Sequence, residues 1–182
     1  MKKKKSLAEY LLEWAAEREG PLVRRMMRRP LLGRLFEMKK IQVLNRDECV
    51  GSFRNDLMKA EDMVLIYSPF VNSVDIERFM NMAELRDALK RGVKVNVVTR
   101  PPEKKVSSSL RKLSEMGVEV YVREGFHEKV IIIDGRIAYV GSANILAWPS
   151  GSDLMQRVED PDTVKELLMK IALPKEEEIL NK

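Results

Sequence analysis

One histidine occurs in this chain, and the polar residues around it have side chains suited to phosphoryl chemistry. His127 is followed two residues later by Lys129, and a stretch further on contains Ser142 and Asn144. A Lys ammonium, a Ser hydroxyl and an Asn amide can all donate hydrogen bonds to phosphate oxygens. An imidazole can attack phosphorus or carry a proton. These four residues are therefore the candidate catalytic set.

A β-hairpin is predicted to bring the four residues together. Asp134-Gly135 is a strong signal for a two-residue turn between strands over residues 127–133 and 136–140. With that turn, the predicted cross-strand pairs are Ile133 with Arg136, Lys129 with Val140 and His127 with Ser142. Strand alternation places His127 and Lys129 on one face, with Ser142 beside His127 and Asn144 following on that face.

The residues of this hairpin resemble a known family motif. It comprises His127-x-Lys129, four residues, Asp134, six residues, and then Gly141-Ser142-x-Asn144. This order and spacing resembles the complete motif of the phospholipase D superfamily, and the resemblance runs from about residue 41 to residue 173. In that family one histidine attacks phosphorus to give a phosphohistidine, while a second protonates the leaving oxygen. Water then hydrolyses the intermediate with the roles reversed.

The resemblance implies a homodimer, because the reaction uses two histidines and the chain has one. The second His127 would come from another copy, with one active site on the two-fold axis. Lys129 and Asn144 of both copies would hold the phosphoryl oxygens, and Ser142 would add a hydroxyl. Asp153 stands where many relatives carry Glu, and would orient His127 and set its tautomer. No cofactor is implied, and one His, one Cys and scattered acids predict no metal site.

Asp134 belongs to the motif, but its position favours a structural role. It lies seven residues from His127, an odd offset on a strand, and it falls in the turn, where Asp is a preferred residue. For His127 the alternative is a structural histidine in a motif kept for packing. The presence of Lys129, Ser142 and Asn144 beside it favours catalysis.

Residues at the ends of two other predicted strands are candidate substrate contacts. Arg100, Lys104 and Lys105 follow a strand's carboxyl end, where open α/β sheets bind ligands. A solvated polar loop explains them equally well. Phe70 follows another strand, after Tyr67-Ser-Pro, and it either stacks on a nucleobase or packs. Trp148, just past Asn144, is a further candidate for the wall of the cleft.

The positive charge is concentrated in the first 40 residues. They hold twelve Lys or Arg against five Glu, a net +7 in a chain whose total is +5. Helical periodicity and a cluster of four arginines mark this segment: Arg24, Arg25, Arg28 and Arg29. Such a basic amphipathic segment binds nucleic acid, lies on a membrane surface, or packs on the domain or a partner. We divide the chain into a basic helical N-terminal extension, 1–40, and a catalytic domain, 41–182.

Apolar runs and helical stretches alternate after residue 40, which predicts an α/β domain. Strands are expected at 41–44, 63–68, 93–99, 118–122, 127–133 and 136–140, and helices at 51–60, 74–91, 107–116 and 162–173. This order predicts a layered domain with a mixed, largely parallel sheet flanked by helices. The phospholipase D resemblance implies the same fold class.

Composition restricts the class of protein. Of the 182 residues, 45% are apolar and 34% are charged, and no apolar run approaches the roughly 18 residues of a membrane span. Glutamates interrupt the region after Lys2–Lys5, where a signal peptide would be apolar. Cys49 alone cannot form an internal disulfide, and we interpret it as a small buried hydrophobe rather than a reactive thiol. These features favour a cytoplasmic protein.

Three functions remain open at this point. The first is a nuclease acting on DNA or RNA, since compact single-motif chains resemble the bacterial endonuclease type of the family. The second is a phospholipid-directed phosphodiesterase whose basic segment lies on a membrane. The third is a non-catalytic nucleic-acid-binding module.

Overall fold

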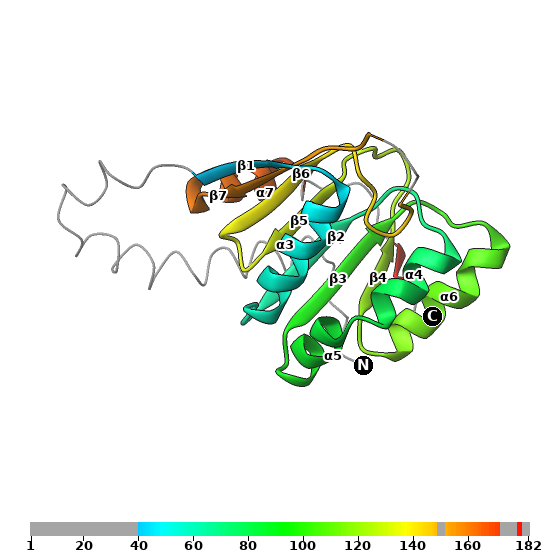
Figure 1. Cartoon of the computed structure of the whole chain (residues 1–182). Helices are drawn as coiled ribbons and strands as arrows, with labels where there is room; N and C mark the ends of the chain where they lie inside the picture. Colours follow the sequence, from blue (N-terminus) through cyan, green and yellow to red (C-terminus); the bar gives the residue numbers. More distant parts are fainter. Residues whose placement is uncertain (1–39, 149–151, 172–177, 180–182) are drawn as a thin grey trace, which may run out of the picture.

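The structure is a computed structural model that describes residues 40–148, 152–171 and 178–179. Eight strands form one sheet: β1 (Lys40–Leu44), β2 (Met63–Tyr67), β3 (Lys94–Thr99), β4 (Glu119–Val122), β5 (Val130–Ile133), β6 (Ile137–Gly141), β7 (Met155–Glu159) and β8 (Glu178–Ile179). The helices of these ranges are α3 (Arg46–Met58), α4 (Ser73–Met80), α5 (Ala83–Lys90), α6 (Lys104–Glu115) and α7 (Pro161–Ile171). Figure 1 shows the arrangement.

The sheet is mixed, with strand order β1-β7-β6-β5-β2-β3-β4-β8. Only the pairings of β2 with β3 and of β3 with β4 are parallel, and the other five pairings are antiparallel. The α/β fold class is confirmed, but the parallel part of the sheet is smaller than expected. Parallel neighbours need a long crossover, whereas β4, β5, β6 and β7 follow one another through turns and loops without a helix.

Helices cover both faces of the sheet. Side chains from α3, α4, α5 and α6 pack against one face, and α7 packs against the other. The central strand β2 is buried along its whole length. Val64 and Ile66 lie in the core on the side of α3 to α6, and Met63, Leu65 and Tyr67 lie in the core on the side of α7. A run of consecutive apolar residues suits such a strand, because both of its faces are covered.

Local capping explains where several helices begin and end. Asn45 and Glu48 form a capping box at the start of α3, which therefore begins five residues before the predicted start at 51. The predicted helix over 74–91 is instead two helices, with a break at Asn81 and Met82. Gly92 follows α5 with φ of 84°, a backbone conformation that glycine adopts without strain.

The hairpin between β5 and β6 has a register one residue away from the predicted one. Its pairs are Ile133 with Ile137 and Val130 with Val140, so the predicted pairings of Ile133 with Arg136 and of Lys129 with Val140 are both wrong. Asp134 has φ of 50° and Gly135 of 63°, the positive values that a tight hairpin turn requires. Arg136 is an extra residue between the turn and β6, and it shifts every later pair.

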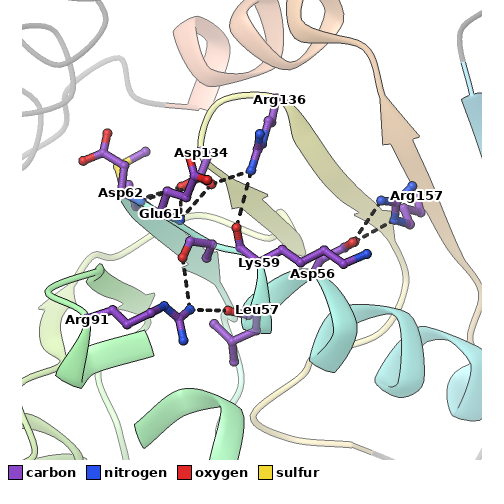
Figure 2. A network of polar contacts seen from close by, with 11 residues as sticks. Asp56, Leu57, Lys59, Glu61, Asp62, Arg91, Asp134, Arg136 and Arg157 are labelled. Carbon is purple, nitrogen blue, oxygen red and sulfur yellow. Dashed lines mark hydrogen bonds and ion pairs between the residues drawn. The ribbon is translucent and has the colours of Figure 1, made fainter. Parts of the chain in front are cut away.

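The carboxylate of Asp134 joins this hairpin to the start of β2 (Figure 2). It accepts hydrogen bonds from the backbone N–H groups of Glu61, Asp62 and Met63 at 2.9 to 3.1 Å. The guanidinium of Arg136 also donates to this carboxylate, at 3.1 Å. The side chain of Asp134 is only 4% exposed. These contacts fit the structural role expected for Asp134.

A second buried network attaches α3 to the sheet. The hydroxyl of Tyr139 donates to Asp56 Oδ2 at 2.5 Å, and Arg157 donates to both oxygens of the same carboxylate at 2.7 and 3.0 Å. Figure 2 shows the Asp56–Arg157 pair beside the Asp134 network. Arg157 lies on β7, a strand that the sequence did not predict, and β7 also pairs with the edge strand β1.

Candidate active site

The sheet topology brings the candidate residues to one edge. β2 and β3 are parallel and end at Tyr67 and Thr99, so Phe70 and Arg100 follow at that edge. β5 is antiparallel to β2 and begins there, which places His127 and Lys129 at the same edge. β6 ends there and is followed by Ser142 and Asn144, and β7 begins there after Asp153. Asp134 lies at the opposite edge, seven residues from His127.

His127 and Lys129 are in contact just before β5 begins. Lys129 Nζ lies 3.1 Å from His127 Nδ1 and donates to the backbone carbonyl of His127, also at 3.1 Å. The imidazole is exposed, and Lys129 is half-buried. An exposed imidazole with a cation at one ring nitrogen can reach a phosphorus atom with the other nitrogen, while the cation neutralises phosphoryl charge.

Phe70 connects three of the candidate residues. Its ring meets the His127 imidazole edge to face, with centroids 5.8 Å apart and an angle of 80°. The guanidinium carbon of Arg100 lies 5.7 Å from the centroid of the Phe70 ring. The backbone N–H of Phe70 donates to Asn144 Oδ1 at 3.4 Å, and Asn144 is buried. This bond leaves the two N–H donors of the Asn144 amide without a hydrogen bond among the described residues.

Ser142 and Asp153 form a separate pair on the same side of the sheet. Ser142 Oγ donates to Asp153 Oδ1 at 2.7 Å and accepts from the backbone N–H of Leu154 at 3.1 Å. Gly141 makes this approach possible, because a Cβ at that position would lie 2.2 Å from the Leu154 carbonyl oxygen. Any larger residue at 141 would push β7 and its leading loop away.

Asp153 does not contact His127 within the described part of the chain. Its carboxylate is bound by Ser142, and the ring nitrogen Nδ1 of His127 is bound by Lys129. Asp153 as the acid that orients His127 therefore remains a prediction. The same holds for Ser142 beside His127, since the sheet pairing ends at Val130 and Val140, before either residue.

The predicted substrate contacts line a groove next to His127. The groove has a volume of about 780 Å³, and its walls include Phe70, Arg100, Pro101, Pro102 and Lys105. Lys105 forms an ion pair with Glu103 at 3.0 Å. Lys104 is exposed on α6 and does not line this groove. The arginines predicted to bind polyanions in the N-terminal extension lie outside the described residues.

One feature of the site was missed at the sequence level. Glu128 Oε2 accepts a hydrogen bond from the backbone N–H of His127 at 2.9 Å and so holds the backbone at His127. Backbone hydrogen bonds lower the pKa of Glu128, although burial opposes this shift. This contact has no signal in residue spacing.

Trp148 does not line the groove beside Phe70, for which the sequence made it a candidate. It lines a separate cavity of about 390 Å³ between α3 and α4, where Arg46 lies over its indole ring.

Metal-binding clusters and membrane-spanning helices are absent from the part of the chain that the structure describes. No group of three or more His, Cys, Asp or Glu side chains in the described ranges is arranged to hold a metal ion. No helix among those residues is long and apolar enough to cross a membrane.

A match to a protein-family model shows which family this chain belongs to. The model of the phospholipase D-like domain of cardiolipin synthase matches residues 53–172. The chain belongs to the phospholipase D superfamily. The matched segment includes every residue of the motif from His127 to Asn144 and the strand end at Phe70.

A cardiolipin synthase is similar to part of this chain. The chain is 36% identical over 101 residues to a cardiolipin synthase from Oceanobacillus iheyensis, an alignment that covers 49% of this chain and 19% of that protein. This chain thus spans about a fifth of the curated relative that it matches.

Solved structures that are similar in fold include a bacterial and an archaeal protein. NucT from Helicobacter pylori is 19% identical with a TM-score of 0.60, and the similarity covers 73% of this chain and 93% of NucT. TrmBL2, an archaeal chromatin protein with a novel mode of DNA binding, is 15% identical with a TM-score of 0.51. That similarity covers 89% of this chain and 62% of TrmBL2.

Proposed function

We propose that this chain is a metal-independent nuclease, which hydrolyses the phosphodiester bonds of DNA or RNA through a phosphohistidine. One observation carries the proposal. The exposed His127, the Lys129 ammonium and the free amide donors of Asn144 share one sheet edge with a groove containing Arg100 and Lys105. The groove also contains two carboxylates, Glu103 and Glu124, so the polyanion would be bound by the donors at the strand ends and by Arg100 and Lys105. A nucleophile beside such phosphate-binding donors suits a phosphodiester.

The reaction proceeds in two displacements. A ring nitrogen of one His127 forms a bond to phosphorus, and the bond from phosphorus to the leaving oxygen breaks. A protonated second imidazole gives its proton to that oxygen. The second imidazole then takes a proton from water as the water oxygen attacks phosphorus, and the P–N bond breaks to release the first histidine.

The second imidazole comes from a second copy of the chain, since each chain has one histidine. A two-fold axis through the site places both copies of His127 on one phosphate and doubles the donors of Lys129 and Asn144. One imidazole must be neutral and the other protonated, so the pair titrates as a unit. Asp153 is proposed to orient His127 in this dimer, and Ser142, which binds Asp153, lies next to it.

The N-terminal extension, 1–40, is proposed to bind the polyanion through Arg24, Arg25, Arg28 and Arg29. Deleting it should flatten the decrease of affinity with salt, because fewer counterions are released, and leave turnover at saturating substrate unchanged.

The competing proposal is that Leu7, Leu11, Trp14 and the segment around Met26 brace the dimer. Sedimentation separates the two, since a monomeric and inactive truncated chain would identify the extension as an assembly element.

A phospholipid-directed phosphodiesterase is the second candidate. Two findings favour it: the matching family model describes a domain of cardiolipin synthase, and the curated relative is named cardiolipin synthase. The reaction chemistry at His127 would be the same, and only the alcohols on either side of the phosphate would differ.

One assay tests the proposed function and the alternative together. The purified full-length chain is incubated, in excess chelator, with single-stranded DNA, duplex DNA, RNA and phospholipid vesicles. We expect cleavage of a polynucleotide to persist in chelator. A strict requirement for a divalent ion would contradict the mechanism, and hydrolysis of phospholipid alone would support the second candidate.

A further inference from the structure

We infer that the ring of Phe70 is the stacking platform for the nucleobase next to the scissile phosphate, and that the site therefore acts on single-stranded nucleic acid. The inference rests on the proposed nuclease function. It adds the strandedness of the substrate and a residue that distinguishes a nucleotide from a phospholipid.

The exposure of Phe70 sets it apart from the other phenylalanines that the structure describes. Phe53, Phe79 and Phe126 are between 0% and 3% exposed, whereas Phe70 is 47% exposed. A half-exposed aromatic side chain contributes less to the core than a buried one, because about half of its area stays in water. Its surface remains available to a ligand at the groove that it lines.

The position of Phe70 relates it to the reacting phosphate. The ring touches the imidazole of His127, and the backbone N–H of the same residue binds Asn144. A planar group stacked on this ring would thus belong to the nucleotide directly beside the phosphate that His127 attacks. The groove of about 780 Å³ lies within the size range of small-molecule sites and accommodates such a nucleotide.

The charge around the ring favours a nucleobase over a cationic lipid headgroup. Arg100 lies over the Phe70 ring with its guanidinium carbon 5.7 Å from the centroid, where it repels a cationic headgroup such as choline. The same guanidinium can stack on a base or bind the neighbouring phosphate. The groove walls combine apolar residues, among them Val71 and Val106, with the charged side chains of Arg100, Glu103, Lys105 and Glu124. An acyl chain placed there would bury charged groups, which is costly.

Strandedness follows from the position of this platform. A base in a duplex is paired and stacked on both neighbours, and it must be extruded before it can stack on Phe70. A base in a single strand reaches the ring without that cost. We therefore expect kcat/KM for a single-stranded oligonucleotide to exceed that for its duplex by at least about 10-fold.

The test compares Phe70 variants of the full-length chain on two single strands of equal length. One carries normal bases, and the other carries an abasic sugar at every position. Phe70→Leu keeps an apolar side chain without a π-face, and Phe70→Trp keeps the π-face. Met58→Ala is the matched control, because Met58 is 51% exposed and lies on α3, outside the groove.

We expect the wild type and Phe70→Trp to favour the base-bearing strand by about 10-fold or more in kcat/KM, and Phe70→Leu to lose that preference. Met58→Ala should match the wild type. Equal cleavage of both strands by the wild type, an equal loss on both strands in Phe70→Leu, or duplex cleavage as fast as single-strand cleavage would overturn the inference while the nuclease function stood. A wild type that cleaves no polynucleotide would overturn the proposed function, and the inference with it.

Discussion

His127 and Asp134 flank the same short strand, β5, and the two ends of that strand have opposite surroundings. At the Asp134 end, a carboxylate that is 4% exposed receives three backbone N–H groups and a guanidinium. At the His127 end, an exposed imidazole contacts one lysine and the edge of one ring. One motif thus combines a residue that holds the fold together with a residue that is open to substrate.

The difference shows why residues of one motif need not share one role. A buried carboxylate with four donors stabilises the native state, since without those donors its charge would be buried without a partner. An imidazole with few partners contributes little to stability and can bind a phosphate. Turnover and unfolding, measured on the same variant, separate these two roles.

Substitution at the open end should give the largest effect, and on turnover alone. We expect His127→Ala to lower kcat at least about 10³-fold, because it removes the nucleophile. Lys129→Ala should lower it about 10²- to 10³-fold, because it removes a cation that acts on the transition state. Chemical denaturation should show both variants within about 0.5 kcal/mol of the wild type. A large loss of stability in His127→Ala would make that residue structural.

Substitution at the buried end should reverse this pattern. Asp134→Asn removes the charge that three backbone N–H groups and Arg136 bind, so we expect the free energy of unfolding to fall by about 2 to 3 kcal/mol. Turnover per folded molecule should stay within about 3-fold of the wild type. Glu61→Gln is the control, since that exposed carboxylate neighbours the network. A stable but inactive Asp134→Asn would show that our division of the motif is wrong.

The Asp56 network gives a smaller effect of the same kind. Burial, and then the hydrogen bond to Asp56, raise the pKa of Tyr139 above its usual value, so the hydroxyl stays protonated and donates at neutral pH. Tyr139→Phe should lower the free energy of unfolding by about 1 to 2 kcal/mol and leave turnover unchanged. Thermal unfolding monitored by circular dichroism measures the change in stability. An unchanged melting temperature would mean that Arg157 alone satisfies Asp56.

Cys49 should give the smallest effect. It is 1% exposed, and burial raises the pKa of its thiol to about 11. The thiolate is the reactive form, so we expect a thiol reagent at pH 8 to label the native chain far more slowly than the unfolded chain, with no loss of activity. Fast labelling of the native protein would show that α3 opens readily.

The sequence predicted six of the eight described strands. It also predicted which residues lie near one another at the candidate site, because the motif links residue types to a known chemistry. His127 and Lys129 do lie together, and Phe70 and Arg100 do follow neighbouring strands, because strand ends can be located from apolar runs. The register of the hairpin was wrong because one residue, Arg136, stands outside the pairing, which residue types do not reveal.

Long-range partners were the part that the sequence could not supply. Strand β7 was missed because its apolar residues, Met155 and Val158, alternate poorly with Gln156 and Arg157. Asp134 accepts hydrogen bonds from backbone N–H groups that precede it by 71 to 73 positions in the sequence. Because the donors are backbone groups, the side chains at those positions do not predict the contact. The partner of Asp153 likewise depended on the approach of β7 to Gly141.

The most direct test of the shared active site is turnover by a mixed dimer. Wild-type and His127→Ala chains carrying different affinity tags are purified together, with a doubly tagged wild-type dimer as the control. One imidazole cannot both attack phosphorus and protonate the leaving oxygen, so we predict that the mixed dimer retains about 1% of the control turnover or less. A mixed dimer with half of the control turnover, or a full-length wild-type chain that is active as a monomer, would contradict this account.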